Sequence, residues 1–226
     1  MTASPRRTAS LGAKSLAVVG ALATLSLAGC AKDNEIDVST GVGITSTRSL
    51  CPAVGVPNYT ADITLFDPPA SRDAAAIDVV AAITNVRTTC NDAAERIYSG
   101  STFDVVATRR DAGPARDVTL PYYSSVVQGG TAVVAKDDNQ VTIHFEAGQT
   151  RATASASAGA YVDRAAATLP DDIRERITRR RRAGDQDAAI DPMSEPEVRA
   201  AVTRASFELL IGFQLTAEQL QYNVTR

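Results

Sequence analysis

The stretch VTIHFE, residues 141–146, decides the fold class of this 226-residue chain. Its apolar Val, Ile and Phe side chains alternate with polar Thr, His and Glu, so the two kinds fall on opposite faces of an extended segment. That alternation is typical of a strand that buries one face and exposes the other. It recurs in residues 76–87 and 102–109, and the three runs together predict a mainly β protein.

Turn-forming residues divide the surrounding sequence into further strands. Residues 117–127 and 131–136 are rich in residue types that favour strands. The turns are expected at Asp111-Ala112-Gly113-Pro114, at Gly129-Gly130 and at Asp137-Asp138-Asn139. This spacing predicts hairpins between neighbouring strands.

Residues 151–162 alternate small residues with Thr and Ser, which fits a strand packed closely against a neighbour, although their Ala content also permits a helix. About seven or eight short strands, with turn signals every 8 to 12 residues or so, favour a β-sandwich of the immunoglobulin or fibronectin type. We expect this sandwich to span residues 41–165.

The pattern changes after Leu169, and residues 166–226 are expected to form a helical C-terminal segment. Pro170 suits the first position of a helix, and the two aspartates that follow it favour the positive end of the helix dipole. Gly184 can end this helix. A short amphipathic helix is therefore predicted, followed by a polar linker.

A second and a third helix are predicted further along the chain. Ser194 and Glu197 form a capping-box pattern at the start of the second. Its apolar side chains recur at helical spacing, at Val198, Ala201, Val202, Ala205, Leu209 and Phe213. Thr216 and Gln219 repeat the capping pattern and predict a short final helix.

The first residues of the chain have the composition of a secretory signal. Arg6, Arg7 and Lys14 make this region basic, and no acidic residue precedes or interrupts the apolar run of residues 16–27. The run is too short to span a bilayer as a helix. A cleaved signal peptide is therefore predicted over residues 1–29.

The apolar run ends in Leu27-Ala28-Gly29-Cys30, which resembles the lipobox of bacterial lipoproteins. The resemblance implies that Cys30 carries acyl chains such as palmitate, and several chains on one residue hold a protein stably to a membrane. Residues 30–40 are polar and acidic and are expected to form a flexible tether. By the sorting rule of this family, Ala31 implies retention at the outer membrane, facing the periplasm. The rest of the chain is similar in general texture to uncharacterised lipoproteins of alphaproteobacteria.

The charge of the chain argues against one class of partner. The net charge is −3 for all 226 residues, and it becomes −6 without residues 1–29, which hold three basic residues and no acidic one. A mildly acidic protein lacks the basic surface that is typical of nucleic-acid binding. No nucleic-acid partner is therefore expected.

Cys51 and Cys90 remain once Cys30 is assigned to the lipid. In an oxidising periplasm, two cysteines most simply form a disulfide. The alternative is a redox-active pair, which usually has the Cys-x-x-Cys spacing that these two residues lack.

Few residues in the sequence are suited to catalysis or metal binding. His144 is the only histidine and is expected on the polar face of a strand, so no Ser-His-Asp or Cys-His arrangement is supported. Asp185, Asp187 and Asp191 fit a solvated linker better than a calcium loop, because apolar residues stand where such a loop needs an oxygen ligand. No glycine-rich phosphate-binding motif is present. We therefore predict no catalytic residue, metal site or cofactor.

One concentrated charge feature lies in and after the first predicted C-terminal helix. It consists of Arg174, Arg176, Arg179, Arg180, Arg181 and Arg182. Cations are favoured at a helix C-terminus, so one interpretation is a solvated helix end. The other is a contact with an anionic partner, such as lipid head groups, lipopolysaccharide phosphates or an acidic protein surface.

Together these features favour a lipid-anchored envelope protein with a non-catalytic binding or scaffolding role. The expected partners are the membrane, through the lipid on Cys30, and an envelope protein. One alternative is an accessory subunit of an outer-membrane assembly complex, docking through the apolar face of residues 198–213 or through the arginine-rich helix. The other is a carboxylate-dependent hydrolase of the cell envelope, which needs acidic residues from distant segments to meet in a pocket.

Overall fold

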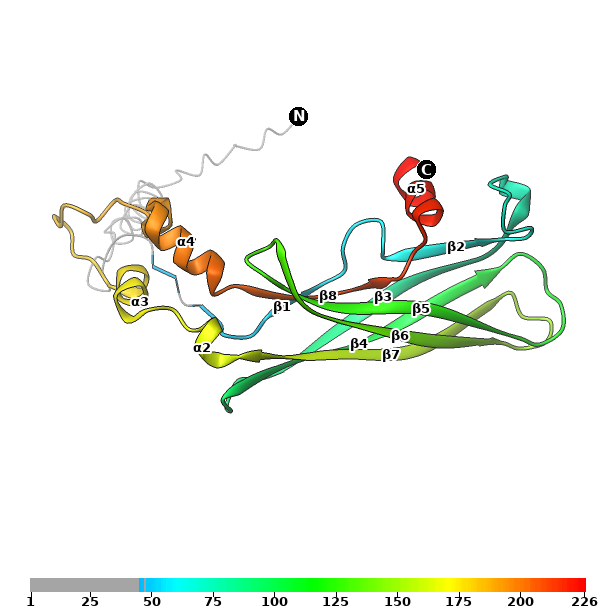
Figure 1. Ribbon diagram of the computed structural model, residues 1–226, viewed down its shortest axis with the longest axis horizontal. Helices are drawn as coiled ribbons and strands as arrows, with labels where there is room; N and C mark the ends of the chain where they lie inside the picture. The colour runs from blue at the N-terminus through cyan, green and yellow to red at the C-terminus, as the bar shows by residue number, and fades with distance from the viewer. Residues whose placement is uncertain (1–44, 47) are drawn as a thin grey trace, which may run out of the picture.

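The computed structural model describes residues 45–46 and 48–226, which form two packed β-sheets with a group of helices beyond one end (Figure 1). The expected signal peptide, the lipidation site Cys30 and the tether of residues 30–40 lie outside the described residues. Among the described residues, no helix is long and apolar enough to cross a membrane.

The first sheet joins strands from distant parts of the chain. It consists of β1 (Ala53–Gly55), β5 (Arg116–Gln128), β6 (Ala132–Phe145) and β8 (Phe207–Phe213). The strand order is β1-β8-β5-β6, so β8 lies inside the sheet. It is parallel to β1 and antiparallel to β5, and β5 is antiparallel to β6.

The second sheet is antiparallel throughout. It consists of β2 (Asp62–Phe66), β3 (Ile77–Asn91), β4 (Arg96–Arg109) and β7 (Arg151–Asp163), in the order β2-β3-β4-β7. A single 3₁₀ turn, η1 (Ala74–Ala76), leads into β3. The alternation in residues 76–87 and 102–109 therefore predicted β3 and β4 correctly. The sequence left residues 151–162 open between a strand and a helix. They form a strand, because they pair along their length with β4.

The two sheets bury their apolar faces against each other. Val141, Ile143 and Phe145 of β6 are at most 5% exposed, and they share a core with Phe103 and Val105 of β4. A smaller cluster fills the end of the sandwich nearest the helices, with Ile97, Val126, Val162, Ala167, Phe207 and Leu209 buried. The prediction of a mainly β sandwich with a C-terminal helix is confirmed.

The hairpin of β5 and β6 contains one predicted turn and excludes another. Gly129 and Gly130 have φ values of 63° and 75°, a left-handed conformation that glycine adopts without steric cost, and they form the turn. The turn predicted at residues 137–139 is wrong, because these residues belong to β6 and pair with residues 122–124. Their side chains are exposed, so they stay solvated while the backbone is hydrogen-bonded.

The prediction that residues 166–226 are helical is wrong for β8. The second predicted helix, α4 (Pro196–Arg204), ends at Arg204, and the chain then enters the first sheet. Leu209 and Phe213 are four residues apart, a spacing that fits one face of a helix and also one face of a strand. Pairing with β1 and β5 decides for the strand, and both side chains become fully buried.

The first and third predicted helices are present. α3 (Asp171–Thr178) has Pro170 as its N-cap and two aspartates in its first turn. α5 (Ala217–Thr225) begins with the predicted capping box, in which the Thr216 hydroxyl accepts from the Gln219 backbone and the Gln219 side chain accepts from the Thr216 backbone. Figure 1 shows α3 at the helical end and α5 next to β2, away from that end.

Candidate functional site

The helical end of the molecule consists of α2 (Arg164–Ala167), α3, the 3₁₀ turn η2 (Pro192–Ser194) and α4, which lie beyond the ends of the strands (Figure 1). These elements have an apolar core of their own. Its buried members are Leu169, Ile173, Ile177, Val198, Ala201 and Ala205. The core covers the apolar face of α4, so that face is not a free docking surface.

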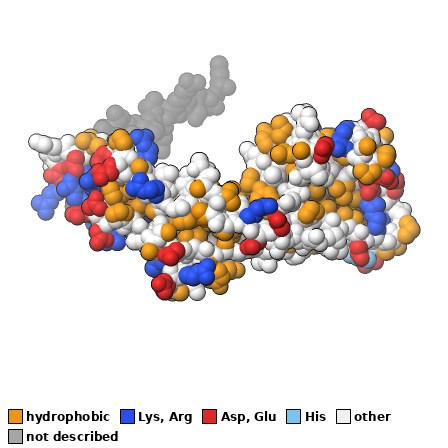
Figure 2. Space-filling view, in the orientation of Figure 1, with side chains coloured by type: hydrophobic (Ala, Val, Ile, Leu, Met, Phe, Trp, Pro, Cys, Tyr) orange, Lys and Arg blue, Asp and Glu red, His pale blue; other side chains and the backbone are white. Residues whose placement is uncertain are grey.

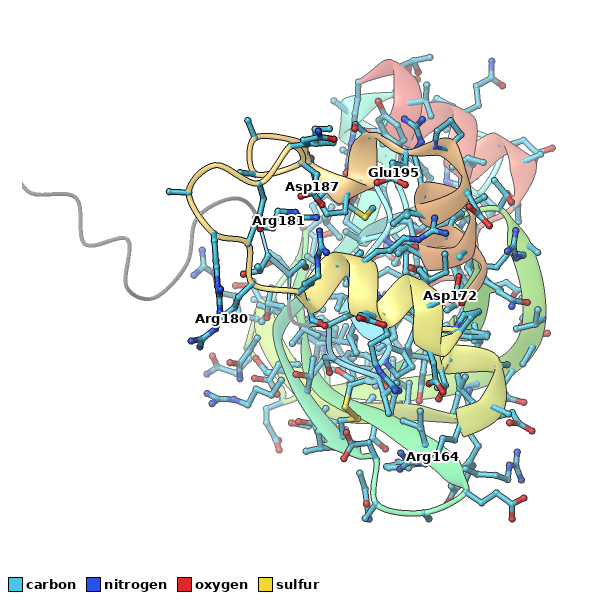
Figure 3. The ribbon with its side chains drawn as sticks, turned by 90° about the vertical axis from the view of Figure 1, so that its left-hand side faces the viewer. Arg164, Asp172, Arg180, Arg181, Asp187 and Glu195 are labelled. Atoms are coloured by element: carbon cyan, nitrogen blue, oxygen red, sulfur yellow. A yellow bond between two sulfur atoms is a disulfide. The ribbon has the colours of Figure 1, made fainter. Side chains whose placement is uncertain are left out.

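The arginines predicted as an anionic contact lie on α3 and in the loop that follows it. Arg174 and Arg176 belong to α3, and residues 179–182 come directly after it. In Figure 3, Arg180 points away from the helices, whereas Arg181 lies close to Asp187. The members of the run therefore have different surroundings.

Arg181 is buried, with 4% of its surface exposed. Its Nε donates to Oδ2 of Asp187 at 3.2 Å, and its Nη2 donates to the carbonyl oxygen of Arg176 at 3.3 Å. Arg179 also forms an ion pair with Asp187. Burial alone would raise the pKa of Asp187, but the hydrogen bonds and charges of Arg181 and Arg179 outweigh it and hold that pKa below its usual range. Asp187 is therefore ionised and ties the linker to the end of α3.

Arg176 connects α3 to α4. Its Nη1 lies 2.9 Å from Oε2 of Glu197 and 3.5 Å from Oε2 of Glu195, and its Nη2 lies 4.0 Å from Oδ2 of Asp172. The hydrogen bond and the charge of Glu197 raise the pKa of Arg176. Arg176 therefore stays charged and is neutralised inside the helical end.

The surface of the helical end carries both signs of charge, as Figure 2 shows. Arg174 contributes to this mixture by pairing with Asp171 at 2.7 Å. Arg180 and Arg182 are exposed, and within residues 48–226 no carboxylate lies within ion-pair distance of either. These two are therefore the members of the run best placed to contact an external anion.

A polar cavity of about 400 Å³ lies among these ion pairs. Asp172, Glu175, Asp187 and Glu195 line it together with three arginines of the run. Acidic residues from separate segments do meet here, as the hydrolase alternative requires. A general acid needs a raised pKa, however, and that of Asp187 is lowered, while Asp172 and Glu195 face Arg176. The arrangement suits the cohesion of the helices better than acid catalysis.

A second cavity, of about 490 Å³, lies between α2, α3 and residues 48–50. Its apolar walls come from Leu50, Ala167, Leu169 and Ile177. Arg48, Arg164 and Arg174 border it. Of these three arginines, only Arg174 is among the six that the sequence predicted as a contact for an anionic partner. Arg48 and Arg164 were missed, because no local pattern indicates that segments so far apart in the chain meet.

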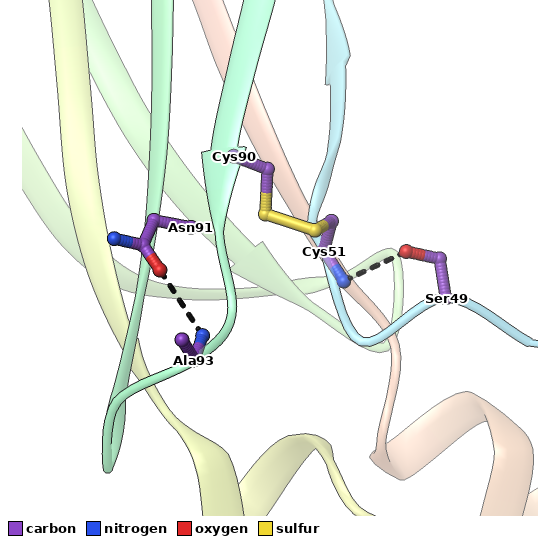
Figure 4. The surroundings of a disulfide bond; sticks show 5 residues. All are labelled: Ser49, Cys51, Cys90, Asn91 and Ala93. Atoms are coloured by element: carbon purple, nitrogen blue, oxygen red, sulfur yellow. Dashed lines mark hydrogen bonds between the residues drawn. A yellow bond between two sulfur atoms is a disulfide. The ribbon is translucent and has the colours of Figure 1, made fainter.

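The predicted disulfide between Cys51 and Cys90 is present (Figure 4). It joins the segment before β1 to the end of β3, with the two Cα atoms 6.1 Å apart. Next to it, the backbone N–H of Cys51 donates to Oγ of Ser49 at 3.1 Å. Arg48 donates from Nη2 to the carbonyl oxygen of Ala205 at 2.9 Å. These contacts fix the segment that forms one wall of the apolar cavity.

His144 lies on the exposed face of β6, as the alternation predicted. Its Nδ1 is 2.5 Å from Oδ1 of Asp117 on β5, and its Nε2 is 3.6 Å from Oε1 of Glu146. The hydrogen bond to Asp117 raises the pKa of His144. A histidine favoured in its charged form between two carboxylates stabilises the pairing of β5 and β6.

The aspartates of the linker form local contacts with the backbone. Asp185 accepts from the backbone N–H of Arg182 at 2.8 Å, and Asp191 caps η2 by accepting from the N–H of Met193 at 2.9 Å. In the part of the chain that the structure describes, no group of three or more His, Cys, Asp or Glu side chains is placed to hold a metal ion.

No protein-family model, no curated protein and no solved structure matches this chain. Of the site residues predicted from the sequence, Cys30 lies outside the described residues, and Cys51 and Cys90 are bonded to each other. The six arginines share the helical end, where most of them form ion pairs within the chain.

Proposed function

We propose that this chain is a lipid-anchored envelope protein, retained at the outer membrane and facing the periplasm, with a non-catalytic binding or scaffolding role. The observation that carries the proposal is the disulfide between Cys51 and Cys90. Disulfides form and persist in oxidising compartments outside the cytosol, which agrees with the signal-like N-terminus. Cys30 is then the thiol available for acylation.

The helical end supports a binding role. Arg176 and Arg181 hold its helices together through ion pairs, and a cavity of about 490 Å³ lies between α2 and α3. Sites for small molecules are commonly preformed cavities with mostly apolar walls and a few polar groups. A rigid sandwich that presents such a cavity is suited to binding a ligand without catalysing a reaction.

The variant Cys30→Ala tests the anchor. The wild-type chain is expected in the membrane fraction, with an acylated Cys30 at its N-terminus, whereas the variant should remain an unlipidated precursor. Mass spectrometry of the N-terminal peptide from the native host measures both states. Cys51→Ala is the control, because it removes a cysteine and leaves the lipobox intact. Normal membrane retention of Cys30→Ala, or an unmodified leader on the wild-type chain, contradicts the proposal.

An accessory subunit of an outer-membrane assembly complex is the second candidate. The apolar face of residues 198–213 is not available as a docking surface for such a subunit, because that face is buried within the chain. Val133 and Val134 support the subunit role instead, because they are 63% and 52% exposed on the edge strand β6, where a partner could dock. A photoreactive residue in place of Val133 should then capture one defined envelope protein in intact cells. Capture of no protein there favours the first proposal.

A further inference from the structure

The apolar cavity at the helical end has the size and the walls of a site for a hydrocarbon group. Its volume of about 490 Å³ lies within the range of roughly 300–1,000 Å³ that is typical of ligand sites. Leu50, Ala167, Leu169 and Ile177 form the walls, and the exposed Thr168 and Thr178 also line it. Each methylene group buried against such walls adds favourable free energy.

Two arginines beside the cavity have no countercharge among the residues that the structure describes. Nε of Arg164 donates to the carbonyl oxygen of Ala94 at 2.8 Å, and Nη2 of Arg48 donates to that of Ala205 at 2.9 Å. These acceptors are neutral, and within residues 45–46 and 48–226 no carboxylate lies within ion-pair distance of Arg48 or Arg164. An anion bound at the cavity would supply the missing negative charge.

Arg48 is the more desolvated of the two. Burial lowers its pKa, and its Nη1 is buried without a hydrogen-bond acceptor among the described residues. A cation withdrawn from water is unfavourable unless an anion or an acceptor faces it. The surroundings of Arg48 therefore favour an anionic ligand over a neutral one.

The cavity also lies where the described chain leads back towards Cys30. Arg48 and Leu50 belong to its wall, and Ser46 just before them donates its backbone N–H to the carbonyl oxygen of Ile177 at 3.0 Å. About 15 residues separate Cys30 from Thr45, and a chain of that length spans at most about 50 Å. An acyl chain on Cys30 would therefore keep Thr45, which leads into this end of the domain, within about 50 Å of a bilayer.

We propose that the cavity takes up one acyl chain of an anionic phospholipid from the membrane and that Arg48 and Arg164 bind the phosphate of its head group. This inference rests on the proposed function, because the anchor on Cys30 brings the cavity to the bilayer. The inference names anionic phospholipids as the ligands for the proposed binding role. It also orients the domain, with the helical end towards the membrane and the sandwich away from it.

Photocrosslinking of the full chain in intact cells tests the proposal. Benzoylphenylalanine in place of Thr178 lies at the cavity, and the same residue in place of Thr153, which is exposed on β7, is the matched control. After irradiation and purification under denaturing conditions, mass spectrometry should find a phospholipid adduct about tenfold more abundant at position 178. Equal lipid adducts at both positions overturn the proposal. So does a peptide adduct at position 178, whether from residues 31–44 or from another protein.

Charge variants test the role of the head group. Arg48→Gln combined with Arg164→Gln should lower the yield of the anionic lipid adduct at position 178 about tenfold. Arg87→Gln combined with Arg151→Gln removes the same charge from exposed positions on the sandwich, outside the cavity lining, and should leave the yield unchanged. Arg48→Lys keeps the charge and should retain the adduct. Equal losses in the two double variants would reveal a general charge effect and overturn the proposal.

The N-terminal peptide from the same samples separates this proposal from the proposed function. If Cys30 is acylated and position 178 gives no lipid adduct, the cavity proposal fails and the anchor stands. If position 178 gives the adduct while Cys30 is unmodified, the anchor fails, and lipid binding by the cavity stands without it.

Discussion

Arg180 and Arg181 are neighbours in the chain, and the fold places them in opposite environments. Arg180 is exposed at the helical end, whereas Arg181 is buried and donates to Asp187 and to a backbone carbonyl. A buried guanidinium with hydrogen-bonded partners contributes to stability, while an exposed one changes it little. The same residue type therefore has a structural role at one position and is free for an external contact at the next.

Replacing each of these two arginines measures the difference. Arg181→Ala should lower the free energy of unfolding by about 1–3 kcal/mol, because it removes the hydrogen bonds that the buried guanidinium donates to Asp187 and to the carbonyl oxygen of Arg176. Arg180→Ala should change it by less than about 0.5 kcal/mol. Urea denaturation of both variants and the wild type gives the two values. Equal effects would show that Arg181 has no structural role.

His144 makes the stability of the protein depend on pH. Its hydrogen bond to Asp117 raises the pKa of His144 in the folded state above the unfolded value of about 6.5. A raised folded-state pKa contributes stability that is fully present below the unfolded pKa and is lost as the pH rises through the folded pKa. His144→Gln should therefore lower the free energy of unfolding near pH 5.5, and the difference should largely disappear by about pH 9.

Urea unfolding at both pH values measures this effect, and an NMR titration of the imidazole gives the pKa of His144 directly. Asp117→Asn is the matched control, because it removes the carboxylate that raises this pKa and keeps the histidine. The same loss for His144→Gln at both pH values would mean that His144 acts through packing rather than charge.

Among the elements, β8 connects the C-terminal part of the chain to the sandwich. It pairs with β1 on one side and with β5 on the other, while α4 precedes it and α5 follows it. Leu209, Ile211 and Phe213 have no exposed surface. The helical end is therefore anchored at both of its ends, by β7 before α2 and by β8 after α4.

Two leucine substitutions test the role of β8. Leu209→Ala removes a fully buried side chain and should lower the free energy of unfolding by about 2–5 kcal/mol. Leu220→Ala on α5, where the leucine is 42% exposed, is the matched control and should cost less than about 1 kcal/mol. Urea denaturation compares the two variants. Similar losses would contradict a central position of β8 in the core.

The elements differ in how well local sequence predicts them. β3, β4 and β6 were predicted in part from alternation, because each contains a stretch that buries one face and exposes the other more. The capping box predicted the start of α5. Residues 207–213 were predicted wrongly, because their apolar spacing is compatible with both periods and only the neighbouring strands decide between them.

In the whole molecule, one disulfide joins the two sheets close to the helical end. Cys51 lies just before β1 of the first sheet, and Cys90 lies near the end of β3 in the second sheet. The bond also fixes Leu50, which forms part of the wall of the apolar cavity. Loss of this bond should therefore affect both the stability of the sandwich and the shape of the cavity.

Removal of the disulfide tests its contribution. The cysteines are 39 residues apart, and closing a loop of this length stabilises the folded state by about 4 kcal/mol in the chain-entropy model. Cys51→Ala combined with Cys90→Ala should lower the free energy of unfolding by up to about that amount. Urea denaturation with and without reductant measures it, and the double variant should not respond to reductant. A wild-type chain whose stability survives verified reduction would contradict the prediction.

The candidate site was only partly predictable from the sequence. The pairing of Cys51 with Cys90 followed from counting the cysteines that remained after Cys30. The arginine run was visible as a cluster, but its division into ion-paired and exposed members was not. No sequence pattern predicted the apolar cavity, because residues 48–50 meet α2 and α3 only in the folded chain.

The sequence by itself determined the mainly β class, much of strands β3 to β6, two of the C-terminal helices and the disulfide pair. Alternation, capping and residue counts suffice for these, because they are properties of short segments or of composition. Only the tertiary structure decided that residues 207–213 form an inner strand, that Arg181 is buried beside Asp187, and that Arg48 and Arg164 border one cavity. Each of these depends on contacts between residues distant in the chain, and no local pattern specifies such contacts.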